Sequence, residues 1–102
     1  MNKKIHFSRL FLIDLEKIGD YIAEQLSNKA ALKVTDEILV SLNVLREFPE
    51  AGQRFILPDG SISGYRYLLC GKYIMFYKII NSEVCVSRVF HQKQDYINIL
   101  FS

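Results

Sequence analysis

Residues 65–96 read YRYLLCGKYIMFYKIINSEVCVSRVFHQKQDY, and this stretch decides the fold that the sequence predicts. It holds three runs rich in aromatic and β-branched residues, which is the composition of β-strands. Two-residue breaks at Gly71-Lys72 and Asn81-Ser82 separate the runs, and such short breaks are typical of β-hairpins. The stretch therefore predicts an antiparallel meander with strands at Tyr65–Cys70, Tyr73–Ile80 and Val84–His91.

Two amphipathic helices are predicted before the meander. Ser8 can cap the first helix, in which apolar residues recur every three or four positions. Ser27-Asn28 interrupts this pattern, and a second helix is expected from Ala30 to Phe48, where Pro49 and Gly52 end it. Because the break between them is short, the two helices should fold back on each other as an antiparallel hairpin.

The remaining segments complete a predicted α+β fold in a single domain of 102 residues. Lys4–Phe7 is a candidate N-terminal strand, and Gln92–Phe101 is a candidate short C-terminal helix. Gln53–Gly64 contains the turn sequence Pro58-Asp59-Gly60 and is expected to be an irregular crossing loop. The predicted order is β-α-α-β-β-β followed by the short helix, with the helical hairpin packed on a small antiparallel sheet.

The two faces of the predicted sheet follow from its register. With two-residue turns, Arg66 lies opposite Tyr77, while Met75 lies opposite Leu68 on one side and Arg88 on the other. Side chains alternate between faces, so one face is nearly all apolar and is expected to receive the helical hairpin: Tyr67, Leu69, Ile74, Phe76, Cys85, Val89 and His91. The other face is expected to stay open for a second polypeptide, because a lone domain seldom leaves so large an apolar patch bare: Arg66, Leu68, Cys70, Tyr73, Met75, Tyr77, Val84, Val86 and Arg88.

Composition narrows the classes of function. The formal net charge is +2; residues 1–52 hold seven Lys/Arg and eight Asp/Glu, whereas residues 53–102 hold six and three. This asymmetry favours an acidic partner for the C-terminal half, although the basic residues are sparser than in most nucleic-acid-binding proteins. No paired Cys/His spacing predicts a metal site, and no cofactor is expected. No apolar run reaches about 18 residues, and the basic start is followed by acidic residues rather than a secretory signal, so we expect a cytoplasmic protein without a membrane partner.

Three segments carry a family resemblance, taken in their order along the chain. They are FPEAG at the end of the second helix, GYRYLLCGKYIMFYKI in the meander, and RVFHQKQDY at its end. Together with the predicted order of elements, they resemble the RelE/ParE superfamily of toxins from bacterial type II toxin–antitoxin systems. The resemblance covers essentially the whole chain. It implies that residues 1–102 form one cytoplasmic toxin domain, which a cognate antitoxin silences in a toxin–antitoxin hetero-oligomer.

One branch of this superfamily, the RelE-like toxins, cleaves messenger RNA on the ribosome. That reaction needs a base for the ribose 2′-hydroxyl, cations for the charged phosphorane and an acid for the leaving oxygen. The residues that match such a site here are Arg66, Arg88, His91 and Tyr96. The match is reduced, because Leu68 follows Arg66 where the RelE-like pattern has a further lysine. In the predicted register, moreover, His91 lies on the opposite face from both arginines.

The ParE-like branch binds DNA gyrase, which requires a complementary surface but no catalytic group. The segment VSRVFHQKQD and the long helical hairpin resemble this branch, so we expect a gyrase-binding toxin without enzymatic activity of its own. The residues expected to contact the antitoxin or the target are Arg66, Tyr73, Met75, Tyr77, Arg88, Lys93 and Tyr96. Two alternatives remain: a RelE-like ribosome-dependent mRNA endoribonuclease, with ribosome and messenger RNA as partners, and a non-toxic antitoxin-binding module of the same fold.

Overall fold

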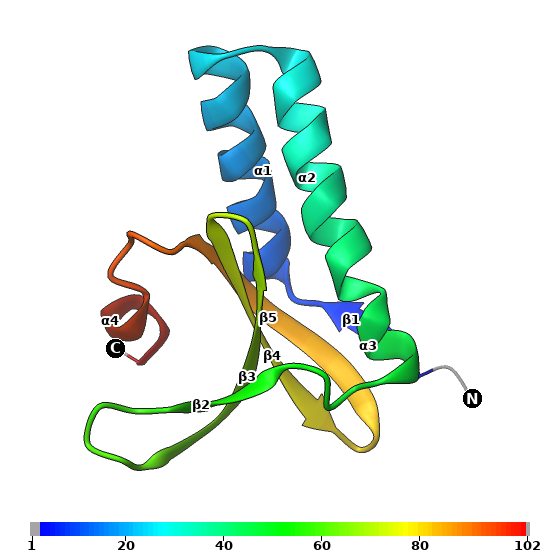
Figure 1. Cartoon of the computed structure of the whole chain (residues 1–102), viewed down its shortest axis with the longest axis vertical. Coiled ribbons are helices and arrows are strands. Elements are labelled where there is room, and N and C mark those ends of the chain that lie inside the picture. Colours follow the sequence, from blue (N-terminus) through cyan, green and yellow to red (C-terminus); the bar gives the residue numbers. More distant parts are fainter. Residues whose placement is uncertain (1–2, 102) are drawn as a thin grey trace.

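A helical hairpin stands over a five-stranded sheet in the computed structural model, which describes residues 3–101 (Figure 1). The elements are β1 (Ile5–Phe7), α1 (Arg9–Gln25), α2 (Asn28–Leu42), α3 (Val44–Glu47), β2 (Gln53–Ile56), β3 (Ile62–Cys70), β4 (Tyr73–Ile80), β5 (Glu83–His91) and α4 (Tyr96–Phe101). The strand order is β1-β5-β4-β3-β2, with β1 parallel to β5 and every other pair antiparallel. The predicted α+β class is confirmed. No helix among the described residues is long and apolar enough to cross a membrane.

Serine side chains set where both long helices begin. The Ser8 Oγ accepts a hydrogen bond from the Phe11 N–H at 3.0 Å, and the Ser27 Oγ accepts one from the Ala30 N–H at 3.0 Å. Because Ser27 is itself the cap, the second helix begins at Asn28 rather than at the predicted Ala30. The predicted single helix is also divided, since α2 ends at Leu42 and the short α3 follows it.

β2 corrects the prediction that residues 53–64 form an irregular loop. Gln53 pairs with Tyr67 and Arg54 pairs with Arg66, so this segment extends the sheet, while the Pro58-Asp59-Gly60 sequence turns the chain into β3. The Asp59 carboxylate accepts hydrogen bonds from the N–H and the hydroxyl of Ser61, at 2.9 and 2.6 Å, which stabilise that turn and lower the pKa of Asp59. A four-residue edge strand carries too little alternation to be recognised without its neighbour.

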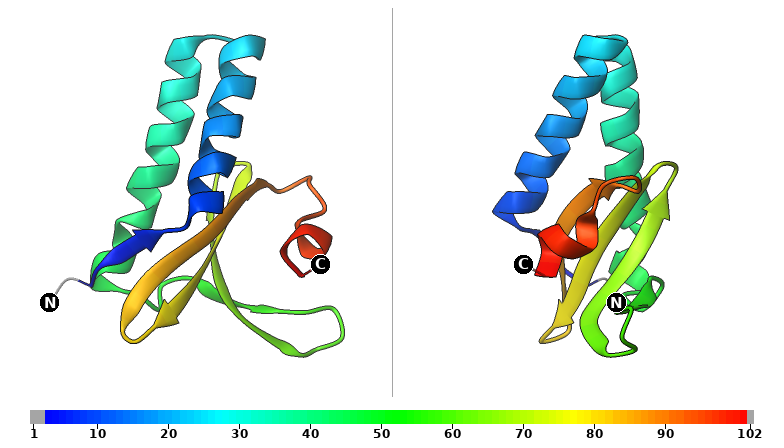
Figure 2. Two further views of the ribbon diagram at one scale, coloured as in Figure 1. Left: turned by 180° about the vertical axis from the view of Figure 1, so that it is seen from behind. Right: turned by 90° about the vertical axis from the view of Figure 1, so that its left-hand side faces the viewer.

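The helices cover the face that was predicted to stay open. The main core joins residues of the helices with residues of that face, and with Val89, which was predicted on the other face: Phe11, Ile38, Leu42, Leu45, Met75, Tyr77, Val84, Val86 and Val89. The opposite face carries a smaller aromatic cluster built on Ile74, Phe76 and Phe90, against which side chains of β2, β3 and α4 pack. Figure 2 shows α3 on one side of the sheet and α4 on the other. The predicted face assignment was therefore wrong, because both faces are apolar and alternation alone does not say which one the helices choose.

An irregularity between β4 and β5 also changes the predicted register. Arg66, Tyr77 and Val86 lie in one row as predicted, but the register shifts between Phe76 and Tyr77. Met75 consequently faces Val89 instead of Arg88, and Arg88 faces Phe76. Because opposed residues share a face, Arg88 lies with the aromatic cluster while Arg66 lies on the helix side. The two arginine side chains, which were expected on one face, thus leave the sheet from different faces.

Tyr77 joins the loop after α3 to the centre of the sheet. Its side chain is fully buried, and its hydroxyl donates to the Pro49 carbonyl at 2.7 Å and accepts from the Gly52 N–H at 2.9 Å. Burial raises the pKa of the Tyr77 phenol. Gly52 has no room for a side chain, because an added Cβ would lie 2.5 Å from the Tyr77 hydroxyl oxygen. The FPEAG segment is therefore conformationally fixed by the phenol.

Tyr77→Phe should lower the free energy of unfolding by about 1–3 kcal/mol, because it leaves the Pro49 carbonyl and the Gly52 N–H without their partner. Tyr67→Phe is the matched control, since its hydroxyl donates only to the exposed Gln53 side chain. Chemical denaturation of the three proteins measures the difference. Equal losses in the two variants would mean that the Tyr77 hydroxyl does not hold the loop.

Candidate partner-binding groove

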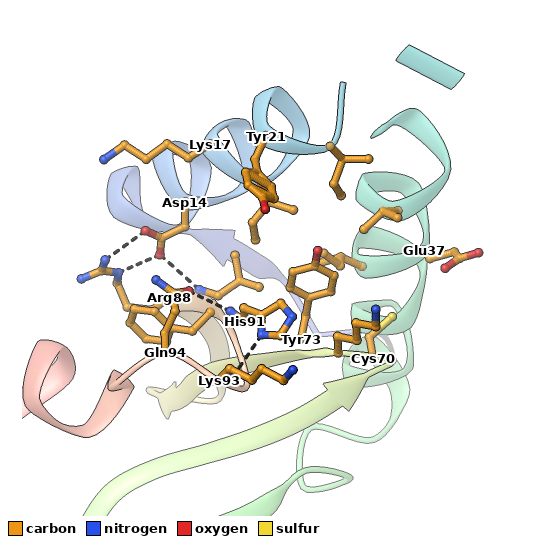
Figure 3. Close-up of a pocket in the computed structure, with 18 of the residues that line it drawn as sticks. Asp14, Lys17, Tyr21, Glu37, Cys70, Tyr73, Arg88, His91, Lys93 and Gln94 are labelled. Carbon is orange, nitrogen blue, oxygen red and sulfur yellow. Dashed lines mark hydrogen bonds and ion pairs between the residues drawn. The ribbon is translucent and has the colours of Figure 1, made fainter. Parts of the chain in front are cut away.

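A groove of about 1050 Å³ lies between the helical hairpin and the end of the sheet at which β3 turns into β4 (Figure 3). Its apolar lining comes from α1, α2 and the strands, and includes Ile18, Ile22, Val34, Ile38, Tyr73 and Val89. The ends of α1 and α2 that meet at Ser27 extend past the strands, whereas the opposite ends of both helices cover the sheet (Figure 1). The groove lies beneath the extending ends. Tyr21, which is 63% exposed, lines the groove from α1.

The rim of the groove is positively charged. Lys17 reaches it from α1, Lys72 from the β3–β4 turn and Lys93 from the segment after β5, and Glu37 opposes them from α2. Asp14 also lines the groove, but its charge is matched by the guanidinium of Arg88. An apolar floor with a basic rim favours an acidic, amphipathic protein segment over a neutral or basic one.

The Asp14–Arg88 pair forms one wall of the groove. The Arg88 Nε and Nη2 donate to the two carboxylate oxygens of Asp14 at 2.7 and 2.9 Å, and the side chains are only 19% and 12% exposed. One of these oxygens also accepts the N–H of Val89 at 3.2 Å. The hydrogen bond to Asp14 raises the pKa of Arg88, and the guanidinium lies 4.8 Å from the centre of the Phe90 ring. Arg88 is thus occupied within the chain.

His91 is held at the mouth of the groove by three contacts. Its Nδ1 accepts a hydrogen bond from the Lys93 N–H at 3.1 Å, and its own N–H donates to the Gln94 Oε1 at 2.9 Å. Its ring packs edge-on against Tyr73 at 5.5 Å, and burial raises the pKa of the Tyr73 phenol. A backbone N–H can only donate, so the neutral imidazole carries its proton on Nε2 and its single lone pair is already used.

The structure brings together only two of the four residues that match a nuclease site. Arg88 and His91 line the groove. Arg66 instead donates to the Gly52 carbonyl at 2.8 Å and the Glu50 carbonyl at 3.3 Å. Tyr96 lies in α4, with its ring stacked on Phe90 in the aromatic cluster. The four side chains therefore do not converge on one point.

The residues expected to contact a partner are also divided. Tyr73, Arg88 and Lys93 line the groove. Met75 and Tyr77 are fully buried beneath the helices, so their prediction as contact residues was wrong. Among the groove residues that sequence reasoning missed are Lys17, Tyr21 and Lys72, whose position depends on how the hairpin meets the sheet. The sequence offered one signal for this groove: Tyr21 is an aromatic residue that lies outside the apolar stripe of α1.

Within residues 3–101, no group of three or more His, Cys, Asp or Glu side chains is arranged to hold a metal ion. The groups that line the groove are an apolar floor, three lysines, Glu37, the Asp14–Arg88 pair and His91. Such a surface is suited to binding an amphipathic segment.

Residues 5–96 match the model of a family described as the ParE toxin of the type II toxin–antitoxin system parDE. This chain belongs to the ParE toxin family. The toxin was predicted from its RelE/ParE resemblance, and both the superfamily and the ParE branch are confirmed. A search of curated protein sequences found no match.

Solved structures share the fold of this ParE-family toxin. A chain of the chromosomal ParDE system from P. aeruginosa is 18% identical, with a TM-score of 0.74 and coverage of 87% of this chain and 95% of that one. A chain of the RelBE2 toxin–antitoxin complex from Mycobacterium tuberculosis is 19% identical, with a TM-score of 0.59 and coverage of 89% and 99%. YafQ from E. coli strain BL21(DE3) is 20% identical, with a TM-score of 0.51 and coverage of 98% and 99%. At these identities the likeness establishes the fold of the toxin.

Asp14→Asn should lower the free energy of unfolding by about 3 kcal/mol, because it leaves a largely buried guanidinium without its counter-charge. Asp20→Asn, a change of the same kind at an exposed position of α1, is the control and should cost less than about 0.5 kcal/mol. Urea denaturation measures both. A loss no larger than that of the control would show that the Asp14–Arg88 pair contributes little to folding.

Proposed function

We propose that this toxin inhibits growth by binding DNA gyrase through its protein surface, and that a cognate antitoxin neutralises it by occupying the groove. The observation that carries the proposal is the state of the candidate catalytic groups. Each of Arg66, Arg88 and His91 already has partners within the chain, and Tyr96 is packed among aromatic rings. A toxin that acts by binding requires no free catalytic group.

RNA cleavage has two chemical requirements that conflict with the hydrogen bonds already made in this groove. The phosphorane needs unpaired cations, but Arg88 is neutralised by the carboxylate of Asp14, which would repel a phosphate. The 2′-hydroxyl needs a base, but the lone pair of neutral His91 accepts the Lys93 N–H. Both demands would require the local hydrogen bonds to break first. The ground state of the groove is therefore better suited to binding than to proton transfer.

The groove supports the antitoxin as partner. Its floor offers apolar side chains of α1, α2 and β5, and Lys17, Lys72 and Lys93 surround it. An amphipathic antitoxin segment with acidic residues on its polar side would bury its apolar side while pairing with these lysines. The neighbours from P. aeruginosa and Mycobacterium tuberculosis come from toxin–antitoxin systems, which supports a hetero-oligomeric complex here as well. Because gyrase acts on chromosomal and plasmid DNA, this function places the toxin in the cytoplasm.

One observation favours the alternative, a ribosome-dependent endoribonuclease. His91 and Arg88 share the groove with Lys72 and Lys93, so a cluster of cations would surround the imidazole if contact with the ribosome released it from the Lys93 N–H. In that mechanism His91 would be the base, and its loss would abolish toxicity. The two functions therefore differ in their dependence on one side chain.

The purified toxin should inhibit supercoiling by gyrase and, when expressed alone, should cause double-strand breaks while transcripts stay intact. His91→Gln should leave this inhibition within about twofold, because gyrase binding uses no base at this position. Supercoiling assays, break detection and transcript mapping measure the three outcomes. Cleavage within translated codons that disappears in the His91→Gln variant would establish the nuclease instead. Normal growth with well-folded toxin would support the non-toxic binding module.

Reversing rim charges should slow antitoxin binding. In Lys72→Glu and Lys93→Glu we expect the association rate constant to fall about tenfold at low salt, with a smaller change in the dissociation rate, because rim charges act mainly by steering. Lys33→Glu, an exposed lysine of α2 outside the groove, is the matched control. Stopped-flow or surface-based kinetics with the antitoxin measure the rates. If all three reversals behave alike, the groove is not the antitoxin site.

A further inference from the structure

A crevice of about 620 Å³ lies between α1 and α2, on a face of the hairpin that does not line the groove. No residue lines both the groove and this crevice. Small residues keep the facing helix surfaces low here: a Cβ added to Gly19 would lie 3.4 Å from the Thr35 Cγ2, and Ala23 and Ala31 line the same depression. The same two helices therefore carry a second concave surface.

Apolar side chains line the crevice and are accessible to solvent. Leu12 reaches it from α1 and Leu32 from α2, and the two residues are 51% and 65% exposed. Neither belongs to the main core or to the aromatic cluster. A partner that covered these leucines would gain the free energy of removing apolar area from water. This part of the hairpin is thus suited to an apolar contact with another protein.

The charged residues that line the crevice are acidic. They are Glu16 and Asp20, which lie one helical turn apart on α1 and are both exposed. Among residues 3–101, no cation forms an ion pair with either carboxylate. Like charges four residues apart on a helix repel, and a cation from a partner would relieve that repulsion. The groove has the opposite charge, so an acidic antitoxin segment that fits the groove is disfavoured here and a basic partner is favoured.

Gyrase, the proposed target, has the required chemistry. An enzyme that holds DNA presents lysine and arginine side chains to the phosphates, so its DNA-binding surfaces are basic. The two carboxylates of the crevice can pair with such cations while the leucines cover neighbouring apolar area. Lys29 and Lys33, the two lysines of α2, do not line the crevice.

We propose that the crevice between α1 and α2 is the surface through which this toxin contacts a basic, DNA-binding surface of gyrase. The inference rests on the proposed function, which names gyrase as the target. The groove and the crevice are built on the same two helices, and an α-helix with its side chains is only about 10–12 Å across. An antitoxin in the groove therefore lies close enough to obstruct an enzyme as large as gyrase. The two partners use different residues and still exclude each other.

Charge reversal in the crevice tests this contact. We expect Glu16→Lys and Asp20→Lys each to raise the toxin concentration that halves supercoiling at least about tenfold, because each sets a cation against a basic surface. Glu47→Lys, the same kind of change at an exposed position of α3 that lines neither surface, is the matched control and should stay within about twofold. The affinity for the antitoxin should stay within about twofold in all three variants, which also verifies their folding.

The apolar part of the contact has its own pair of variants. Leu32→Gln should weaken inhibition of supercoiling about fivefold, because it removes an apolar side chain from the interface. Val40→Gln is the matched control, since Val40 is also 65% exposed on α2 but lies outside the crevice, and it should stay within about twofold. Fluorescence anisotropy of labelled toxin with purified gyrase measures binding separately from supercoiling.

The outcomes separate this inference from the proposed function. If the wild-type toxin inhibits gyrase and both charge reversals inhibit it equally well, the crevice is not the contact, although the proposed function stands. A wild-type toxin that neither binds nor inhibits gyrase would refute both. An equal loss of antitoxin affinity in the charge reversals would overturn the inference by assigning the crevice to the antitoxin. A toxin dimer that Leu32→Gln dissociates, as measured by sedimentation, would also overturn it by assigning the crevice to a second copy.

Discussion

The bidentate bond between Asp14 and Arg88 is the constraint on which most of the structure depends. It fixes the first turns of α1 against β5 and completes one wall of the groove. The same carboxylate accepts the Val89 N–H and so closes part of the β5 edge. A single, partly buried carboxylate thus positions a helix, bonds a strand and neutralises a cation. Such a pair is costly to break because either partner alone would be left as an uncompensated charge.

Other candidate catalytic side chains, like Arg88, have hydrogen-bond partners within the chain. Arg66 is used by carbonyls of the FPEAG segment, Arg88 by Asp14, and the imidazole lone pair of His91 by a backbone N–H. The remaining cations are the lysines on the rim, which attract an approaching acidic chain most strongly at low salt. The side chains that match a nuclease site thus form hydrogen bonds within the fold, whereas the lysines of the rim are suited to attracting an acidic chain.

The two edges of the sheet differ in how their backbone groups are covered. At the β5 edge, side chains of Ser8, Asp14 and Gln94 bond backbone groups of Ser87, Val89 and His91 where β1 no longer covers the strand. At the β2 edge, Arg54 lies opposite Arg66, so two cationic residues are neighbours on the outermost pair of strands.

Local sequence by itself determined the helical hairpin, the meander and its two turns, because serine caps, apolar spacing and two-residue breaks act within a few residues. It also supported membership of the RelE/ParE superfamily, through short segments kept in order. Only the tertiary structure decided which face of the sheet the helices cover, since both faces are apolar and alternation assigns residues to a face without choosing between faces. The shift between Phe76 and Tyr77, which separates Arg88 from Arg66, depends on the pairing of β4 with β5. β2 and the groove are likewise products of contacts between distant segments, which no local pattern records.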